Sequence, residues 1–365
     1  MKTLNSSLGF LFGGSVKALK VILFLSGVGI LLTAASDRLA QPQQHESVST
    51  VVVNGPAGTQ RQRKAVVSAA PAVPRAFVSI NGSDTNPCSA VQPCRSFNQA
   101  LAVVEPGGEI VVQNSGGYST GFTITQGVTI DAAGFNASVI STSNTDLCTI
   151  NTGPNDRVVL RGISFHGANV GANAIAITQV GSLYVEHCSI AEFVGDGVHM
   201  TNGGNLWVTD TDVRSCDNGL LIQTSSASAN LFAQDSRFTE SLGGALPAGS
   251  GVLVLATGSG SATGWISNCT ASDCLTGFGV ESTSSGTADL TLTNCRAFAN
   301  FTGFGAVTFG TGQANMRIAN CVATQNQNGV AQQGGAASVL GSNPGTNFFS
   351  GNIVNGVTTG SVTLQ

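Results

Sequence analysis

Large aromatic side chains recur at similar intervals through the middle of this 365-residue sequence. Both tryptophans and one of the two tyrosines belong to a single run of matching positions: Tyr184, Trp207, Phe232 and Trp265. Aromatic side chains at matching positions of a repeat stack on one another, or, where they face solvent, offer a platform for the C–H faces of sugar rings. Both interpretations stay open, and the second makes these four residues a candidate substrate-binding surface for a polysaccharide.

The nine cysteines contain no Cys-x-x-Cys pairing, so we expect no zinc site, no other metal and no cofactor. Cys88 and Cys94 lie close together in a proline-containing segment, and in an exported chain we expect them to form a disulfide that staples the local fold. Four further cysteines recur at matching positions and read as small buried side chains: Cys188, Cys269, Cys295 and Cys321.

A repeat of about 22–27 residues positions these side chains. Cys269, Cys295 and Cys321 each follow an asparagine and are 26 residues apart, and a second marker, glycine followed by an apolar residue, keeps the same period. Within each repeat, three short segments alternate apolar and other residues, as Leu183 and Val185 do in the first segment of one repeat. Coils of three strands that cannot bury a core alone must stack, so the sequence predicts an all-β fold, a parallel β-helix.

One column of the repeat explains residues that would otherwise suggest catalysis. Between the first and second strands, every coil carries a residue type that tolerates positive φ: Gly162, His187, Asp210, Asp235, Asn268, Asn294 and Asn320. A sharp bend needs that conformation. Asp210 and Asp235 are therefore predicted to be bend residues rather than catalytic carboxylates.

The first coil needs a cover, because an open solenoid end exposes apolar area and strand edges. Residues 96–104 have the apolar spacing of a short amphipathic helix, and Pro106 with the following glycines ends it. We expect an N-terminal cap over 76–108 that contains this helix, followed by the β-helix over 109–365.

The entry segment FVSINGSDTNPCSAVQPCRSFNQALAVVEPGGEIVV and the coil pattern resemble the right-handed parallel β-helix proteins of the pectin-lyase-like superfold, many of them secreted bacterial proteins. The resemblance covers roughly residues 76–365. It implies a substrate groove over the third strands, whose outward positions include His199 and, further along, Gly279, Gly305 and Glu281. The Asn-Thr-Asp, Asp-Asp, Gly-His-Gly and Arg-Ile-Lys motifs of the polygalacturonases are missing, and we find no triple-carboxylate cluster of the pectate-lyase kind.

Two classes of function stay open, because the superfold holds both enzymes and non-enzymatic surface proteins. The first is a secreted, non-catalytic β-helix that binds polysaccharide or serves as a surface or structural module. The alternative is a polysaccharide lyase or glycoside hydrolase with an atypical site. His199 and Glu281 are several coils apart, and acid–base chemistry needs two groups within reach, so His199 reads as a solvent-exposed side chain and the first class is favoured.

Charge and the N-terminal segment limit the partners. From residue 76 onward the chain has seven Arg, no Lys and seventeen Asp or Glu, a net charge of −10 that excludes nucleic acid as a partner. Basic residues, the apolar run Val21–Ala35 and small residues predict a signal peptide over 1–36, with an uncleaved membrane anchor as the alternative. Residues 37–75 read as a flexible linker. These features predict a secreted, periplasmic or cell-surface protein, and the oligomeric state is left open.

Overall fold

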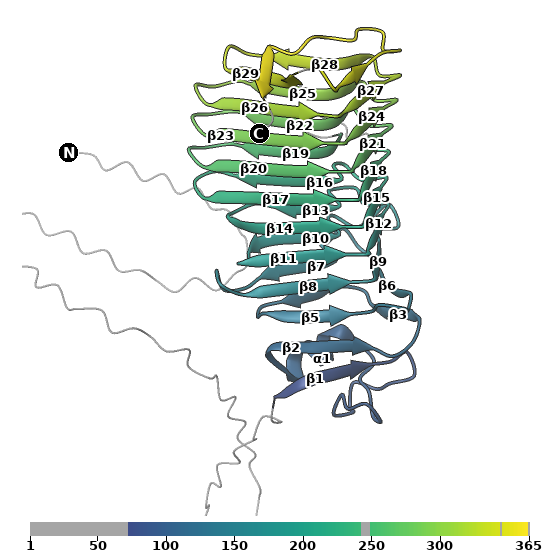
Figure 1. The fold of residues 1–365 in the computed structure, drawn as a ribbon. Coiled ribbons are helices and arrows are strands. Elements are labelled where there is room, and N and C mark those ends of the chain that lie inside the picture. The colour runs from purple at the N-terminus through teal and green to yellow at the C-terminus, as the bar shows by residue number, and fades with distance from the viewer. Residues whose placement is uncertain (1–71, 242–248, 344, 364–365) are drawn as a thin grey trace, which may run out of the picture. The chain divides into compact units, whose positions relative to one another are not determined.

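The computed structural model describes residues 72–241, 249–343 and 345–363 (Figure 1). The expected signal peptide or anchor over 1–36 lies outside these residues, as does the expected linker over 37–75 up to residue 71. The first strand begins at Val73, inside the range expected for the linker. Across the described residues, no helix has the length and apolar character that a membrane span needs.

The described chain is a right-handed parallel β-helix, as the coil pattern predicted (Figure 1). Each coil gives one strand to each of three parallel sheets, which we call A, B and C and which hold 12, 10 and 9 strands. Neighbouring strands of one sheet come from successive coils, so every strand except the two at the ends of its sheet pairs with its counterparts one coil earlier and one coil later.

Sheet A comprises β1 (Val73–Val78), β2 (Val104–Val112), β5 (Val128–Asp131), β8 (Arg157–Arg161), β11 (Ser182–Glu186), β14 (Gly204–Thr209), β17 (Ser228–Gln234), β20 (Ser261–Ser267), β23 (Thr287–Thr293), β26 (Gln313–Ala319), β29 (Ala337–Asn343) and β31 (Gly360–Thr363). Sheet B comprises β3 (Gly116–Ser119), β6 (Ala137–Ile140), β9 (Ile163–His166), β12 (Ser189–Ala191), β15 (Asp212–Arg214), β18 (Arg237–Thr239), β21 (Thr270–Ser272), β24 (Arg296–Phe298), β27 (Val322–Thr324) and β30 (Phe348–Phe349). Sheet C comprises β4 (Phe122–Ile124), β7 (Cys148–Asn151), β10 (Ile175–Gln179), β13 (Val198–Met200), β16 (Leu220–Thr224), β19 (Ser250–Ala256), β22 (Thr276–Ser282), β25 (Thr302–Thr308) and β28 (Asn328–Gln333).

The core is a continuous stack of the inward-facing side chains of all three sheets. Leu183 and Val185 of β11 are buried, and their register partners in β14 are the buried Leu206 and Val208. The predicted cysteine column is also buried, and burial raises the pKa of the Cys269 thiol to about 12. Fully buried cysteines of this kind pack as small apolar side chains, as the sequence predicted.

The bend between sheets A and B confirms the predicted column. All seven predicted residues adopt positive φ, from 47° at Asp210 to 71° at Gly162. The side chains of this column point away from the core, and the carboxylate of Asp210 pairs with Nδ1 of His187 at 2.8 Å. Asp210 and Asp235 therefore serve the bend, and their spacing reflects the coil period.

A short helix covers the N-terminal end of the solenoid. Helix α1 (Phe97–Val103) begins at Ser96, whose hydroxyl accepts the backbone N–H of Gln99 at 3.2 Å. Its buried Phe97 lies 5.3 Å from the ring of Phe122 in the first strand of sheet C, measured between centroids. Cys88 and Cys94 form a disulfide in the loop before the helix.

Candidate functional site

Along the solenoid, the central outward positions of sheet C change from large side chains to glycines that have none. Its central outward column, read along the solenoid, is Ala176, His199, Leu221, Leu253, Gly279, Gly305 and Ala331. Leu221 and Leu253 pack with Leu255 into a small apolar cluster outside the main core. The column then drops to two glycines, and their lack of side chains leaves the main chain of β22 and β25 as a bare floor.

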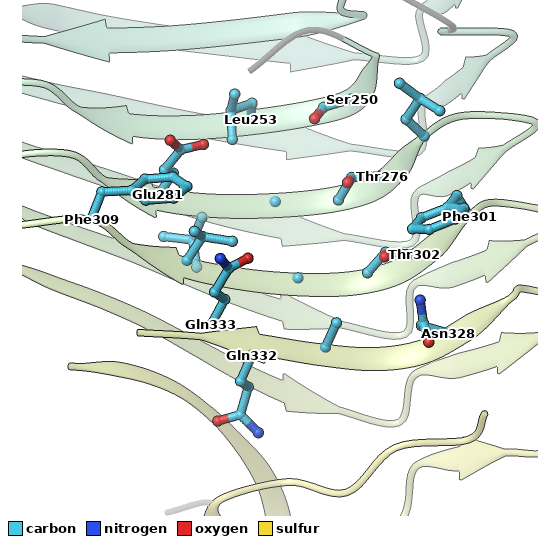
Figure 2. A pocket seen from close by; sticks show the side chains of 16 residues that line it. Ser250, Leu253, Thr276, Glu281, Phe301, Thr302, Phe309, Asn328, Gln332 and Gln333 are labelled. Carbon is cyan, nitrogen blue, oxygen red and sulfur yellow. The ribbon is translucent and has the colours of Figure 1, made fainter. Parts of the chain in front are cut away.

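A hollow of about 450 Å³ lies over this floor. Figure 2 shows Phe301 at one end of strand β25 and Phe309 at the other, with Glu281 close to Phe309. The two phenylalanines are 52% and 59% exposed, although apolar side chains of this size are usually covered. Two accessible rings therefore lie on either side of a main-chain floor.

Neutral polar side chains complete the lining. One outward column carries Ser250, Thr276, Thr302 and Asn328. The column on the other side of the glycines carries Glu281 and, two strands later, Gln333. Glu281 is the one titratable side chain among the lining residues, and burial raises the pKa of its carboxyl group. A single carboxyl group cannot supply both the acid and the base of a glycosidic cleavage.

His199 differs from the sequence expectation of a solvent-exposed side chain. Only 24% of the His199 side chain is exposed, because its Nδ1 pairs with Oδ2 of the buried Asp196 at 3.0 Å. The other oxygen of Asp196 accepts the backbone N–H of Asn218 at 3.1 Å and its side-chain amide at 2.8 Å. The partner of His199 stands only three residues earlier in the turn, and the sequence analysis had not paired them.

His199 nevertheless lies far from the hollow. Its outward column reaches Gly279 only after Leu221 and Leu253, three strand spacings of about 4.8 Å and hence about 14 Å along the sheet. The Nε2 atom of His199 is buried and pairs with no described residue. The structure therefore brings Glu281 to the hollow but not His199.

The four aromatic residues of the sequence analysis lie together on the outer face of sheet A. Tyr184, Trp207, Phe232 and Trp265 are register partners on β11, β14, β17 and β20. Their ring centroids are 4.7, 4.9 and 4.9 Å apart, and neighbouring planes differ by about 10° or less. The guanidinium of Arg157 covers the free face of Tyr184, 4.5 Å from the ring centroid.

Within the stack, the rings cover one another's faces, and only the outer face of Trp265 has neither a described ring nor the Arg157 guanidinium against it. Ring edges remain accessible, and Trp265, at the end of the stack, is 43% exposed. A second hollow of about 210 Å³ lies against the edges of Trp207, Phe232 and Trp265, together with neighbouring threonine, serine and glutamine side chains. Ring stacking thus accounts for the faces inside the stack, and a sugar platform would have to use the second hollow beside the rings.

Metal ions in proteins are usually held by several His, Cys, Asp or Glu side chains that lie close together. Within the described ranges, no three His, Cys, Asp or Glu side chains form a group that could hold a metal ion. The buried cysteines outside the disulfide, which are Cys148, Cys188, Cys216, Cys269, Cys274, Cys295 and Cys321, are separate from both hollows.

Sequence reasoning found the floor of the groove but not its ends. Gly279, Gly305 and Glu281 were assigned to outward positions correctly. Phe301 and Phe309 flank β25, where strand alternation no longer predicts direction, so alternation did not mark them as exposed. Their placement on both sides of a Gly-containing strand was the available signal.

Comparison with solved structures supports the fold. Pectate lyase Pel9A aligns with a TM-score of 0.55 at 14% identity, over 78% of this chain and 79% of that chain. XylC, solved in complex with xylose, aligns with a TM-score of 0.52 at 9% identity, over 73% of this chain and 68% of that chain. No protein-family model and no curated protein matches the sequence. At these identities the likeness shows the parallel β-helix fold and nothing about activity.

Proposed function

We propose that this β-helix is a non-catalytic module that binds a polysaccharide in the hollow over sheet C. The observation that carries the proposal is the floor of Gly279 and Gly305 between the exposed rings of Phe301 and Phe309. Glycines let a ligand approach the main chain closely, and accessible rings pack against the apolar faces of sugars. A rigid strand floor offers this surface without an ordering cost on binding.

The absence of a catalytic pair supports binding without turnover. Among the described lining residues, Glu281 has no titratable partner within the hollow. Both cleavage by hydrolysis and cleavage by elimination need at least one further proton-transferring or charge-stabilising group. The groove of this chain offers hydroxyl and amide groups instead.

A polysaccharide lyase or glycoside hydrolase is the alternative. The observation in its favour is the pair of Asp196 and His199, in which the carboxylate holds Nδ1 and leaves Nε2 without a described partner. A carboxylate that fixes Nδ1 in this way orients an imidazole for proton transfer, but Nε2 of His199 is buried. Its distance from the hollow argues against this alternative.

The aromatic stack on sheet A remains a proposed second contact for the same polymer. Trp265 and the hollow beside it are accessible, and an exposed apolar patch usually marks an interaction site.

The proposed location is outside the cytoplasm, either secreted, periplasmic or at the cell surface. The leader-like N-terminal sequence and the Cys88–Cys94 disulfide support it.

Affinity gel electrophoresis of the full chain against a panel of soluble polysaccharides tests the proposal. Gly305→Thr should abolish retention, because a Cβ there lies 3.4 Å from the side chains of Thr276 and Thr302, an ordinary contact that fills the floor without moving the backbone. Ala176→Thr, in the same outward column but outside the hollow, is the matched control and should be retained normally. Equal retention of both variants would refute the groove, and release of reducing ends or unsaturated products would favour the enzyme.

A further inference from the structure

Resting on the proposed function, we infer that the hollow over sheet C takes an uncharged polysaccharide and rejects polymers of uronic acids. The inference comes from the charges that face the groove. Uronate polymers carry one carboxylate on each sugar, and proteins hold carboxylates with arginine, lysine or a bound cation.

Sheet C offers none of these cations. No arginine occurs in any of its nine strands, and the last lysine of the whole sequence is Lys64. No described arginine of sheets A and B lines the hollow, and several have partners elsewhere: Arg161 pairs with Asp131 and Glu186, and Arg317 pairs with Asp289. The described residues also contain no group of three or more His, Cys, Asp or Glu side chains that could hold a bridging metal ion.

The one charge in the groove has the wrong sign for an anionic ligand. Glu281 lies between Leu255 and Val307 in its outward column, and no ion pair joins it to a described residue. Because desolvation already penalises its ionised form, an incoming carboxylate would add repulsion to an uncompensated charge. A sugar hydroxyl, in contrast, can donate a hydrogen bond to the same oxygen atoms.

The neutral polar groups of the groove match hydroxyl-bearing sugars. Thr276, Thr302, Asn328 and Gln333 line the hollow, and their side chains make no hydrogen bond to another described residue. Hydroxyl and amide groups both donate and accept, as sugar hydroxyls do. With Phe301 and Phe309 at the two ends, the groove offers uncharged hydrogen bonding and apolar contact.

The experiment compares neutral and acidic polymers on the full chain at pH 8. Xylan, mixed-linkage β-glucan and galactomannan are the neutral probes, and polygalacturonate and alginate are the acidic ones. We expect retention by at least one neutral polymer, a tenfold or greater loss of that affinity in Phe309→Ala, and no retention by either acidic polymer even at low salt, where charge attraction is strongest. Phe348→Ala, which removes a ring of matching exposure (58%) on sheet B, should bind like the unaltered chain.

The charge itself is tested at Glu281. Glu281→Gln should keep neutral-polymer affinity within about threefold, because the amide still offers an acceptor, whereas Glu281→Lys should create retention by polygalacturonate. Retention of an acidic polymer by the unaltered chain, lost in Gly305→Thr, would overturn the inference and leave polysaccharide binding standing. If no polymer of either kind is retained, the proposed function itself fails.

Discussion

The side-chain oxygen of Asn326 accepts two hydrogen bonds from Asn300, one from its backbone N–H and one from its side-chain amide, each at 3.0 Å. The amide of Asn326 in turn donates to the carbonyl of Ala297 at 3.0 Å. The same pair of bonds joins Asn326 to Asn352 one coil later, at 2.9 Å. This ladder satisfies backbone groups in the turn between sheets B and C, where no strand partner is available.

Asn326→Ala should lower the free energy of unfolding by about 2–4 kcal/mol, because it removes the acceptor of the buried backbone N–H of Asn300 and of one of its two side-chain N–H groups. Urea denaturation measures the loss. Asn155→Ala, at an exposed position with no side-chain hydrogen bond among the described residues, should change stability by less than about 0.5 kcal/mol. A similar small effect at both positions would show that the ladder is not stabilising.

Two substitutions at one bend separate backbone strain from the loss of a side chain. Asn294 has a φ of 56°, so Asn294→Val should cost about 1–2 kcal/mol or more, while Asn294→Gly should be close to neutral. Thermal unfolding of the two variants gives the comparison. Equal melting temperatures for Val and Gly at this position would contradict the assigned conformation.

The disulfide predicts how many free thiols the chain has. Thiol titration of the unreduced, denatured chain should find seven free thiols, because Cys88 and Cys94 are paired and the other seven cysteines are not. Cys88→Ser together with Cys94→Ser should lower stability by about 2 kcal/mol on a chain-entropy model for so short a loop. A count of nine reactive thiols would show that Cys88 and Cys94 are not bonded.

Asp217 predicts a pH dependence of defined sign. Burial, and then the nearby Asp196 carboxylate, raise the pKa of Asp217 above its ordinary value of 3.8. The ionised group therefore opposes folding, and its cost appears as pH rises from below 3.8 through the raised value. Asp217→Asn should match the unaltered chain in stability at pH 3 and exceed it at pH 7. Lower stability of the variant at pH 7 would show that the ionised form is favoured instead.

The aromatic stack predicts unequal effects for its two tryptophans. Trp207 stacks on two rings and Trp265 on one, and each such pair contributes about 0.5–1.5 kcal/mol. Trp207→Ala should therefore be about twice as destabilising as Trp265→Ala in urea denaturation. Gel retention of the same variants shows whether the stripe also binds polysaccharide: loss of retention in Trp265→Ala with a small change in stability would support it.

Periodicity explains why the coils and the floor of the groove were predictable and the ends of the groove were not. The cysteine spacing, the inward alternation and the bend residues all repeat, so each coil supports the assignment of the next. The turn between sheets B and C also repeats a positive φ, at residues whose types do not predict it. Ala299 and Gln325 both have a φ of 58°, close to the value at Asn294. The asparagines at 300, 326 and 352 keep a spacing of 26 residues, a signal that was available in the sequence.

The hollow depends on neighbours that only the three-dimensional register brings together. Gly279 and Gly305 are unremarkable in a glycine-rich chain until Leu253 is seen to end the apolar column beside them. His199 likewise gains its partner through the turn that carries Asp196. Asp196 lies before β13, and Phe301 and Phe309 flank β25, so their directions are set outside the strands, where period-two alternation does not apply.

Because of where they lie, the two tryptophans report by fluorescence on unfolding of the middle coils only. Trp207 and Trp265 are the only tryptophans in the sequence, and both lie in the middle of sheet A, on β14 and β20. Their fluorescence would stay unchanged while coils fray from either end. The buried thiols of Cys148 and Cys321 lie nearer the two ends of the solenoid, so the order in which they become labelled would reveal whether unfolding starts at one end or throughout.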